Sequence, residues 1–174
     1  MKAHIQKILN QQKEFIRNTY RHLHAHPELS FEEHETAAFI CRQLENMQIP
    51  YRSGIADTGI LARIEGRNPE KRCIALRADM DALPVCENVN IDWKSKNENV
   101  MHACGHDAHT ACLLGAAAIL NQIRNDFEGT ILLVFQPGEE KAPGGARLML
   151  EAGVFDGYKP ELIIAQHVSV DFPT

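Results

Sequence analysis

Several features that would assign this chain of 174 residues to a specialised class are missing from it. Lysine and arginine form no block and the net charge is -5, which argues against a nucleic-acid-binding protein. No apolar run approaches the length of a membrane span, and the first residues lack the apolar core of a signal peptide. Internal repeats are absent too. We therefore expect one globular domain with neither a nucleic-acid nor a membrane partner.

The cysteine pattern fits reduced thiols better than a disulfide framework. The chain has five cysteines, an odd number, and their spacing is irregular. This pattern is typical of reduced thiols in the cytosol, so we expect a cytoplasmic protein.

The hydrophobic pattern alternates between helices and strands. Apolar residues recur at three- and four-residue steps over residues 4–24, which predicts an amphipathic helix that Pro27 stops. A second helix is expected to run to about Met47, with Ser30 and Glu33 forming a capping box at its start.

The remaining elements favour an α/β fold. Apolar runs predict buried strands at residues 59–64, 73–78, 130–135 and 161–165, and helices at 107–121 and from 144–145 to about 152; the polar span 85–100 indicates a loop. Strands that alternate with helices predict a mostly parallel sheet with helices on both faces.

Residues 101–109 bring a thiol, three imidazoles and a carboxylate together within a short stretch just ahead of a helix. These are the groups that borderline divalent metals prefer as ligands. Cys104 and His106 are two residues apart, so both point to one side of an extended loop. We read this stretch as half of a metal-hydrolase centre, with Glu139, Glu140 and His167 as the other half.

The predicted topology brings these residues to one rim. Asp79 and Asp81 follow one strand, the Glu139–Glu140 pair follows another, and His167 ends a third. In open α/β sheets the ligand site lies beyond the carboxyl ends of the strands. Right-handed connections would bring the start of the helix after Cys104 to the same edge.

Metal-assisted hydrolysis is the chemistry that this set suits. One glutamate of the Glu139–Glu140 pair would bind the metal, and its neighbour would move a proton from water to the leaving amine. Asp107 or Asp79 would orient His106.

Each residue also has an ordinary interpretation. A single cysteine before a helix is most often a small buried hydrophobe, and a Glu-Glu pair is usually a solvated turn. His167 alone would be an ordinary histidine, and Asp79 and Asp81 would be turn or cap residues.

Four blocks of sequence resemble the M20 metallopeptidase/amidohydrolase family, and in particular its N-acyl-amino-acid amidohydrolase branch, which includes hippurate hydrolase and auxin-conjugate hydrolase types. The blocks are RHLHAHPELSF at 21–31, RADMDALP at 77–84, MHACGHDAH at 101–109 and FQPGEE at 135–140.

The resemblance implies a site with two divalent metal ions, commonly Mn or Zn and sometimes Ni or Co. By motif match Cys104, His106, Glu140 and His167 would be metal ligands and Glu139 the catalytic base. Of Asp79 and Asp81, the second is the better match to a carboxylate that supports catalysis by orienting a ligand. The implied substrate is a small-molecule N-acyl amino acid, whose amide bond is hydrolysed.

The resemblance also implies a longer protein. Family members insert a lid and dimerisation domain and then return to the catalytic domain with a final histidine ligand, and the full-length relatives are expected to be homo-oligomers. We therefore expect residues 1–174 to be the N-terminal portion of a metal-dependent catalytic domain, without the lid or the C-terminal return.

Two other hypotheses remain open on the sequence alone. The chain would be a catalytically inactive remnant or partner-dependent module, or a peptidase of the same family that acts on free peptides.

Overall fold

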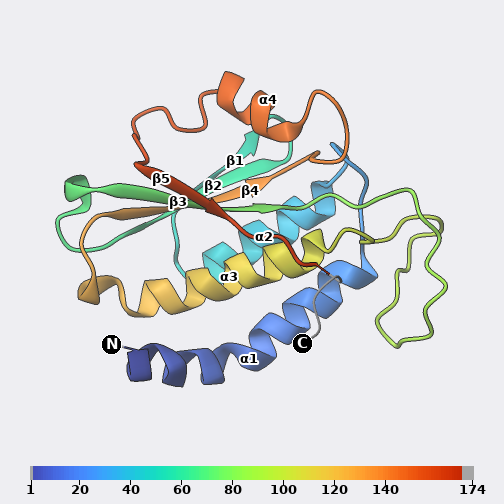
Figure 1. Ribbon diagram of the computed structural model, residues 1–174, viewed down its shortest axis with the longest axis horizontal. Helices are drawn as coiled ribbons and strands as arrows, with labels where there is room; N and C mark the ends of the chain where they lie inside the picture. Colours follow the sequence, from blue (N-terminus) through green and yellow to red (C-terminus); the bar gives the residue numbers. More distant parts are fainter. Residues whose placement is uncertain (1, 170–174) are drawn as a thin grey trace.

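A single mixed sheet forms the middle layer of the computed structural model, which describes residues 2–169 (Figure 1). Its strands are β1 (Tyr51–Ile55), β2 (Gly59–Glu65), β3 (Cys73–Asp79), β4 (Thr130–Gln136) and β5 (Leu162–Ala165), in the spatial order β1-β2-β4-β3-β5. The helices are α1 (Lys2–Ala25), α2 (His34–Asn46), α3 (His106–Gln122) and α4 (Gly145–Glu151), with short 3-10 turns at Pro69–Lys71 and Arg124–Asp126.

The layers follow from the packing of the helices. Helices α2 and α3 cover one face of the sheet, α4 lies against the other, and α1 packs on α3 (Figure 1). β3 runs parallel to β4 and β5, whereas β2 is antiparallel to β1 and β4. The expected helices on both faces are confirmed, and the sheet is mixed rather than purely parallel.

β4 is the strand around which the core is built. Ile131, Leu133 and Phe135 point into the core beneath α2 and α3, and the alternate residues Leu132 and Val134 enter the core beneath α4. All seven residues of β4 are buried, because both faces are covered. This double burial explains why the strand has a continuous apolar sequence.

Close packing between α1 and α3 depends on a small residue. A Cβ atom added to Gly115 would lie 2.6 Å from Cγ1 of Ile16. A residue without a side chain is therefore needed where the two helices cross. Helix α1 ends at Ala25, two residues before Pro27, as the sequence predicts.

The predicted capping box at the start of α2 is wrong. Glu33 occupies the N-cap position, but its side chain makes no capping hydrogen bond. The carboxylate of Glu28 instead accepts the backbone N–H groups of Glu35 and Thr36, at 3.1 and 2.7 Å. A carboxylate from outside the helix therefore satisfies the free donors of its first turn.

Two strands differ from the expectation. β1 was not predicted, because its interior is the polar and exposed stretch 52–54, which shows no apolar alternation. β5 was expected to be buried, but all four of its residues are exposed; it lies at the sheet edge and pairs with β3 alone. Residues 85–100 contain no helix or strand, as predicted. Within residues 2–169, no helix combines the length and the apolar character needed to cross a membrane.

The packing of β4 gives a first prediction. Leu133→Ala should lower the free energy of unfolding by about 2–5 kcal/mol, because Leu133 is fully buried and its neighbours cannot close the cavity completely. Leu150→Ala is the matched control, since Leu150 is 61% exposed on α4 and the same change there should stay within about 0.5 kcal/mol. Urea unfolding measures both, and equal losses would contradict the assignment of β4 as the core strand.

Candidate metal centre

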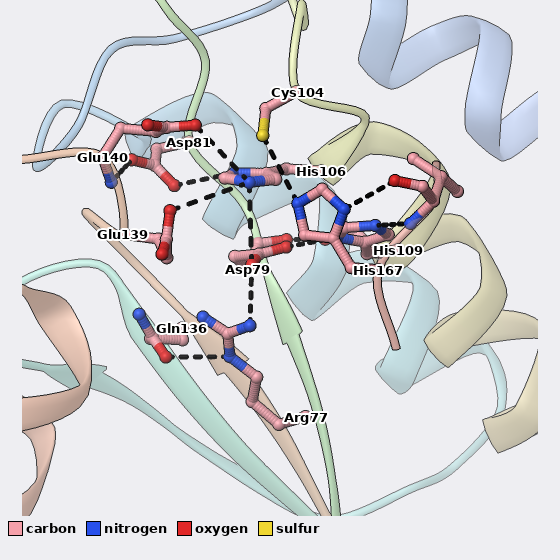
Figure 2. A network of polar contacts seen from close by, with 12 residues as sticks. Arg77, Asp79, Asp81, Cys104, His106, His109, Gln136, Glu139, Glu140 and His167 are labelled. Carbon is pink, nitrogen blue, oxygen red and sulfur yellow. Dashed lines mark hydrogen bonds and ion pairs between the residues drawn. The ribbon is translucent and has the colours of Figure 1, made fainter. Parts of the chain in front are cut away.

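The carboxyl ends of the three parallel strands meet at one edge of the sheet, as the sequence predicted. Asp79 is the last residue of β3, and the segment after β4 carries Glu139 and Glu140. β5 ends at Ala165, two residues before His167. Figure 2 shows these side chains gathered at the start of α3.

His106 lies at the centre of the group. It is the first residue of α3 and is fully buried. Its Nδ1 lies 3.1 Å from Oδ1 of Asp81, whereas its Nε2 has no hydrogen-bond partner. Carboxylate oxygens of Asp79, Glu140 and Glu139 lie 3.6, 3.8 and 3.9 Å from this Nε2. An unpaired buried nitrogen is rare in proteins, and here it faces three acidic groups.

Cys104 and His167 approach the same place from two other segments. The Cys104 Sγ lies 3.4 Å from Nε2 of His167. Nδ1 of His167 donates its proton to the backbone carbonyl of Val168 at 2.6 Å. This tautomer leaves the lone pair on Nε2, which is the form in which imidazole binds a metal.

The local charge is strongly negative around the thiol. Burial raises the pKa of Cys104, and the nearby carboxylates of Glu140, Glu139 and Asp79 raise it further, to about 12. Cysteine binds a metal as the thiolate, so a metal cation would have to replace the proton of the Cys104 thiol.

In the Asp81–His106 pair, the contacts with neighbouring groups outweigh the effect of burial on both pKa values. Burial alone would raise the pKa of Asp81, but hydrogen bonds from His106, Ser30 and the backbone amides of Glu140 and Glu139 hold it well below its usual range. Burial alone would lower the pKa of His106, but Asp81, Asp79 and Glu140 raise it. The carboxylates around His106 therefore favour a positive charge at this place, which a proton or a metal cation can supply.

The arrangement fits a divalent cation. Ligand atoms of Cys104, His106 and His167 lie within 4.8 Å of one another, as do those of His106, Glu139 and Glu140. His106, whose Nε2 is free, belongs to both groups. Thiolate, imidazole and carboxylate together suit a borderline divalent cation.

A third group of possible ligands suits a metal less well. It joins His106 to Asp79 and His109, but both oxygens of Asp79 already have partners. Oδ1 lies 2.6 Å from Nδ1 of His109, and Oδ2 lies 2.7 Å from Nη1 of Arg77. The backbone N–H of Val168 donates to Nε2 of His109 at 2.9 Å, so neither nitrogen of this ring is free.

From the sequence, His109 is only one of the three imidazoles in residues 101–109, and Arg77 has no assigned role. His109 follows His106 by three residues, a spacing that puts both on one face of a helix, and this signal was available. The Arg77 guanidinium also donates to Oε1 of Gln136 at 2.8 Å (Figure 2), and only the pairing of β3 with β4 reveals that contact.

The expectation that Asp107 orients His106 is wrong. Oδ2 of Asp107 lies 2.6 Å from Nδ1 of His24 on α1, and Glu87 lies 3.2 Å from the other nitrogen of that ring. The hydrogen bond to Asp107 raises the pKa of His24 against the effect of burial, and Glu87 adds to the rise. Asp107 therefore links α3 to α1. It points away from the metal centre because it follows His106 directly, and consecutive residues of a helix point in different directions.

Known proteins share both the sequence and the fold. The chain is 46% identical over 167 residues to an N-acyl-L-amino acid amidohydrolase from Geobacillus stearothermophilus, covering 96% of this chain and 44% of that protein. It is 48% identical over 161 residues to the N-acetylcysteine deacetylase of Bacillus subtilis, covering 90% of this chain and 40% of the relative. The chain thus spans less than half the length of these relatives.

A solved structure supports the same conclusion. A dinuclear metal binding peptidase of the M20 family from Bacillus subtilis superposes with a TM-score of 0.84 at 44% identity, over 99% of this chain and 45% of that one. The family model for Peptidase family M20/M25/M40 matches residues 75–173, more than half of the sequence. The chain therefore belongs to Peptidase family M20/M25/M40.

Proposed function

We propose that this chain serves the metal-dependent hydrolysis of the amide bond of N-acyl amino acids, with two divalent ions, Mn or Zn, as cofactors. The observation that carries the proposal is the free, buried Nε2 of His106 among a thiol, a second imidazole and carboxylates. The amidohydrolase and deacetylase names of the two relatives support the substrate class.

Four residues would hold the metal: Cys104, His106, Glu140 and His167. The two glutamates are distinguished by how firmly they are fixed. The backbone N–H of Glu140 donates to Oδ2 of Asp81 at 2.9 Å, and its side chain is 24% exposed. The side chain of Glu139 is 44% exposed, so it is freer to reach a water molecule and a substrate.

When bound, the divalent ions would polarise the amide carbonyl and lower the pKa of a water molecule. The carboxylate of Glu139 would take a proton from this water as its oxygen attacks the carbonyl carbon. The same carboxyl group would then give the proton to the leaving nitrogen as the C–N bond breaks, which yields a carboxylic acid and a free amino acid. Asp81 would keep His106 in the tautomer with its lone pair on Nε2.

We also infer that the protein works in a reducing compartment such as the cytoplasm. All five cysteines are free thiols, and Cys104 needs to stay reduced to bind a metal.

Metal content tests the ligand assignment. Cys104→Ser and His106→Asn should each weaken zinc binding at least tenfold, because each removes one ligand atom; the asparagine keeps an amide N–H near Asp81 while it removes Nε2. Cys86→Ser is the control, since this exposed thiol lies outside the metal centre. Elemental analysis after loading with Mn or Zn, together with zinc titration, measures the effect, and unchanged binding in both variants would exclude the assignment.

A second prediction concerns the proposed base. Glu139→Gln should reduce turnover of an N-acetyl amino acid by about 10²–10⁴-fold, because the amide cannot accept the proton, while the metal content stays the same. Glu151→Gln on α4 is the matched control. Turnover by Glu139→Gln equal to that of the wild type would rule out Glu139 as the base, and no turnover by the metal-loaded wild type would favour the inactive-module hypothesis.

A substrate panel separates the amidohydrolase from a peptidase. The Mn-loaded chain should release the amino acid faster from an N-acetyl amino acid than from the corresponding unblocked dipeptide, since the named relatives act on N-acyl compounds. Liquid chromatography of the released amino acid provides the measurement. Faster cleavage of the dipeptide would favour the peptidase.

A further inference from the structure

The carboxyl group of Glu33 is buried in the core, and the proposed reaction does not use it. The residue is 0% exposed. Its Oε1 accepts the backbone N–H of Gly138 at 2.8 Å, and its Oε2 accepts the hydroxyl of Thr58 at 2.7 Å. A buried carboxyl group is costly unless it is hydrogen-bonded, so these two contacts account for its presence there.

Gly138 is the residue immediately before Glu139, in the segment 137–144 that we call the carboxylate loop. Its φ of +51° lies in the left-handed region, and a Cβ atom at this position would lie 2.3 Å from Cε1 of Phe31. The carbonyl of Gly138 accepts the N–H of Gly145 at 2.9 Å. The N–H of Gly138 is therefore bound by Glu33 and its C=O by the first residue of α4, while the ring of Phe31 packs against its Cα.

Ser30, three residues before Glu33, is linked to the same loop through Asp81. Its hydroxyl donates to Oδ2 of Asp81 at 2.6 Å, and this oxygen also accepts the backbone N–H of Glu140 at 2.9 Å. Of the Ser30–Glu33 pair, which looks like a helix cap in the sequence, Glu33 thus contacts the carboxylate loop directly before Glu139, and Ser30 is linked through Asp81 to the residue after it.

We propose that Glu33 is a positioning residue for the metal centre, which it serves by holding the amide of Gly138 and so fixing the position of Glu139 and Glu140. This inference rests on the proposed function. The side-chain hydrogen bonds of Glu33 go to Gly138 and Thr58, neither of which is a proposed metal ligand. The alternative is a purely structural role, in which Glu33 ties the start of α2 to the β1–β2 turn through Thr58 and the carboxylate loop keeps its place without it.

Three variants of the full chain separate the two roles, with cobalt(II) as the probe because its visible spectrum reports on ligand geometry. Glu33→Ala should weaken cobalt binding at least tenfold and change the spectrum, because Gly138 loses its acceptor. Glu33→Gln should remain close to the wild type, since its amide oxygen can accept from Gly138 while its NH₂ group donates to the Thr58 oxygen. Thr58→Val should lower the melting temperature and leave the cobalt spectrum unchanged.

The outcomes are distinct. A folded Glu33→Ala chain, judged by circular dichroism, with wild-type cobalt affinity and spectrum would overturn the positioning role. If Glu33→Ala does not fold, Glu33→Met takes its place, because it keeps the length of the side chain and removes the carboxylate that accepts the N–H of Gly138; a wild-type spectrum in that variant would also overturn the role. A wild-type chain that binds no cobalt would overturn the proposed metal centre, and the inference with it.

Discussion

The carboxyl group of Asp81 is the point on which the rest of the site depends. It receives the hydroxyl of Ser30, the ring N–H of His106 and the backbone N–H of Glu140. These donors come from the segment before α2, the start of α3 and the loop after β4. One buried carboxyl group therefore fixes three parts of the chain relative to one another. Burial opposes its ionisation, and the hydrogen bonds outweigh that cost.

Several acidic side chains lie close together near Asp81, and their mutual repulsion lowers the stability of the folded chain. Glu139, Glu140 and Asp79 all face the buried His106, and their mutual repulsion is relieved when positive charge occupies the space between them. A cation that binds only the folded chain stabilises it by mass action. The arrangement that suits a bound cation is thus one that ordinary core packing would avoid, as is common where a binding site competes with stability.

The sequence predicts the frame of the site better than its internal contacts. The apolar runs of β3 and β4, and the ligand-type residues after them, are local signals, and one topological rule then brings Asp79, Glu139 and His167 to one edge. The fates of Ser30 and Glu33 are not local: their spacing is that of a capping box, but tertiary partners at Asp81 and Gly138 compete for the same side chains. The exposure of β5 likewise depends on what lies beside it in space.

The strand order also determines when such a site can form. β1 and β2 are neighbours in the chain and can pair early, whereas β2 meets β4 through Ile60 and Phe135, and β3 meets β5 through Ile74 and Leu162. The entropy of closing such long loops delays these pairings until many contacts form together. Because the candidate metal centre lies at the ends of these late-pairing strands, we expect a chain that is still being synthesised to lack a preformed site for an ion. Metal loading is therefore expected to follow folding rather than to guide it.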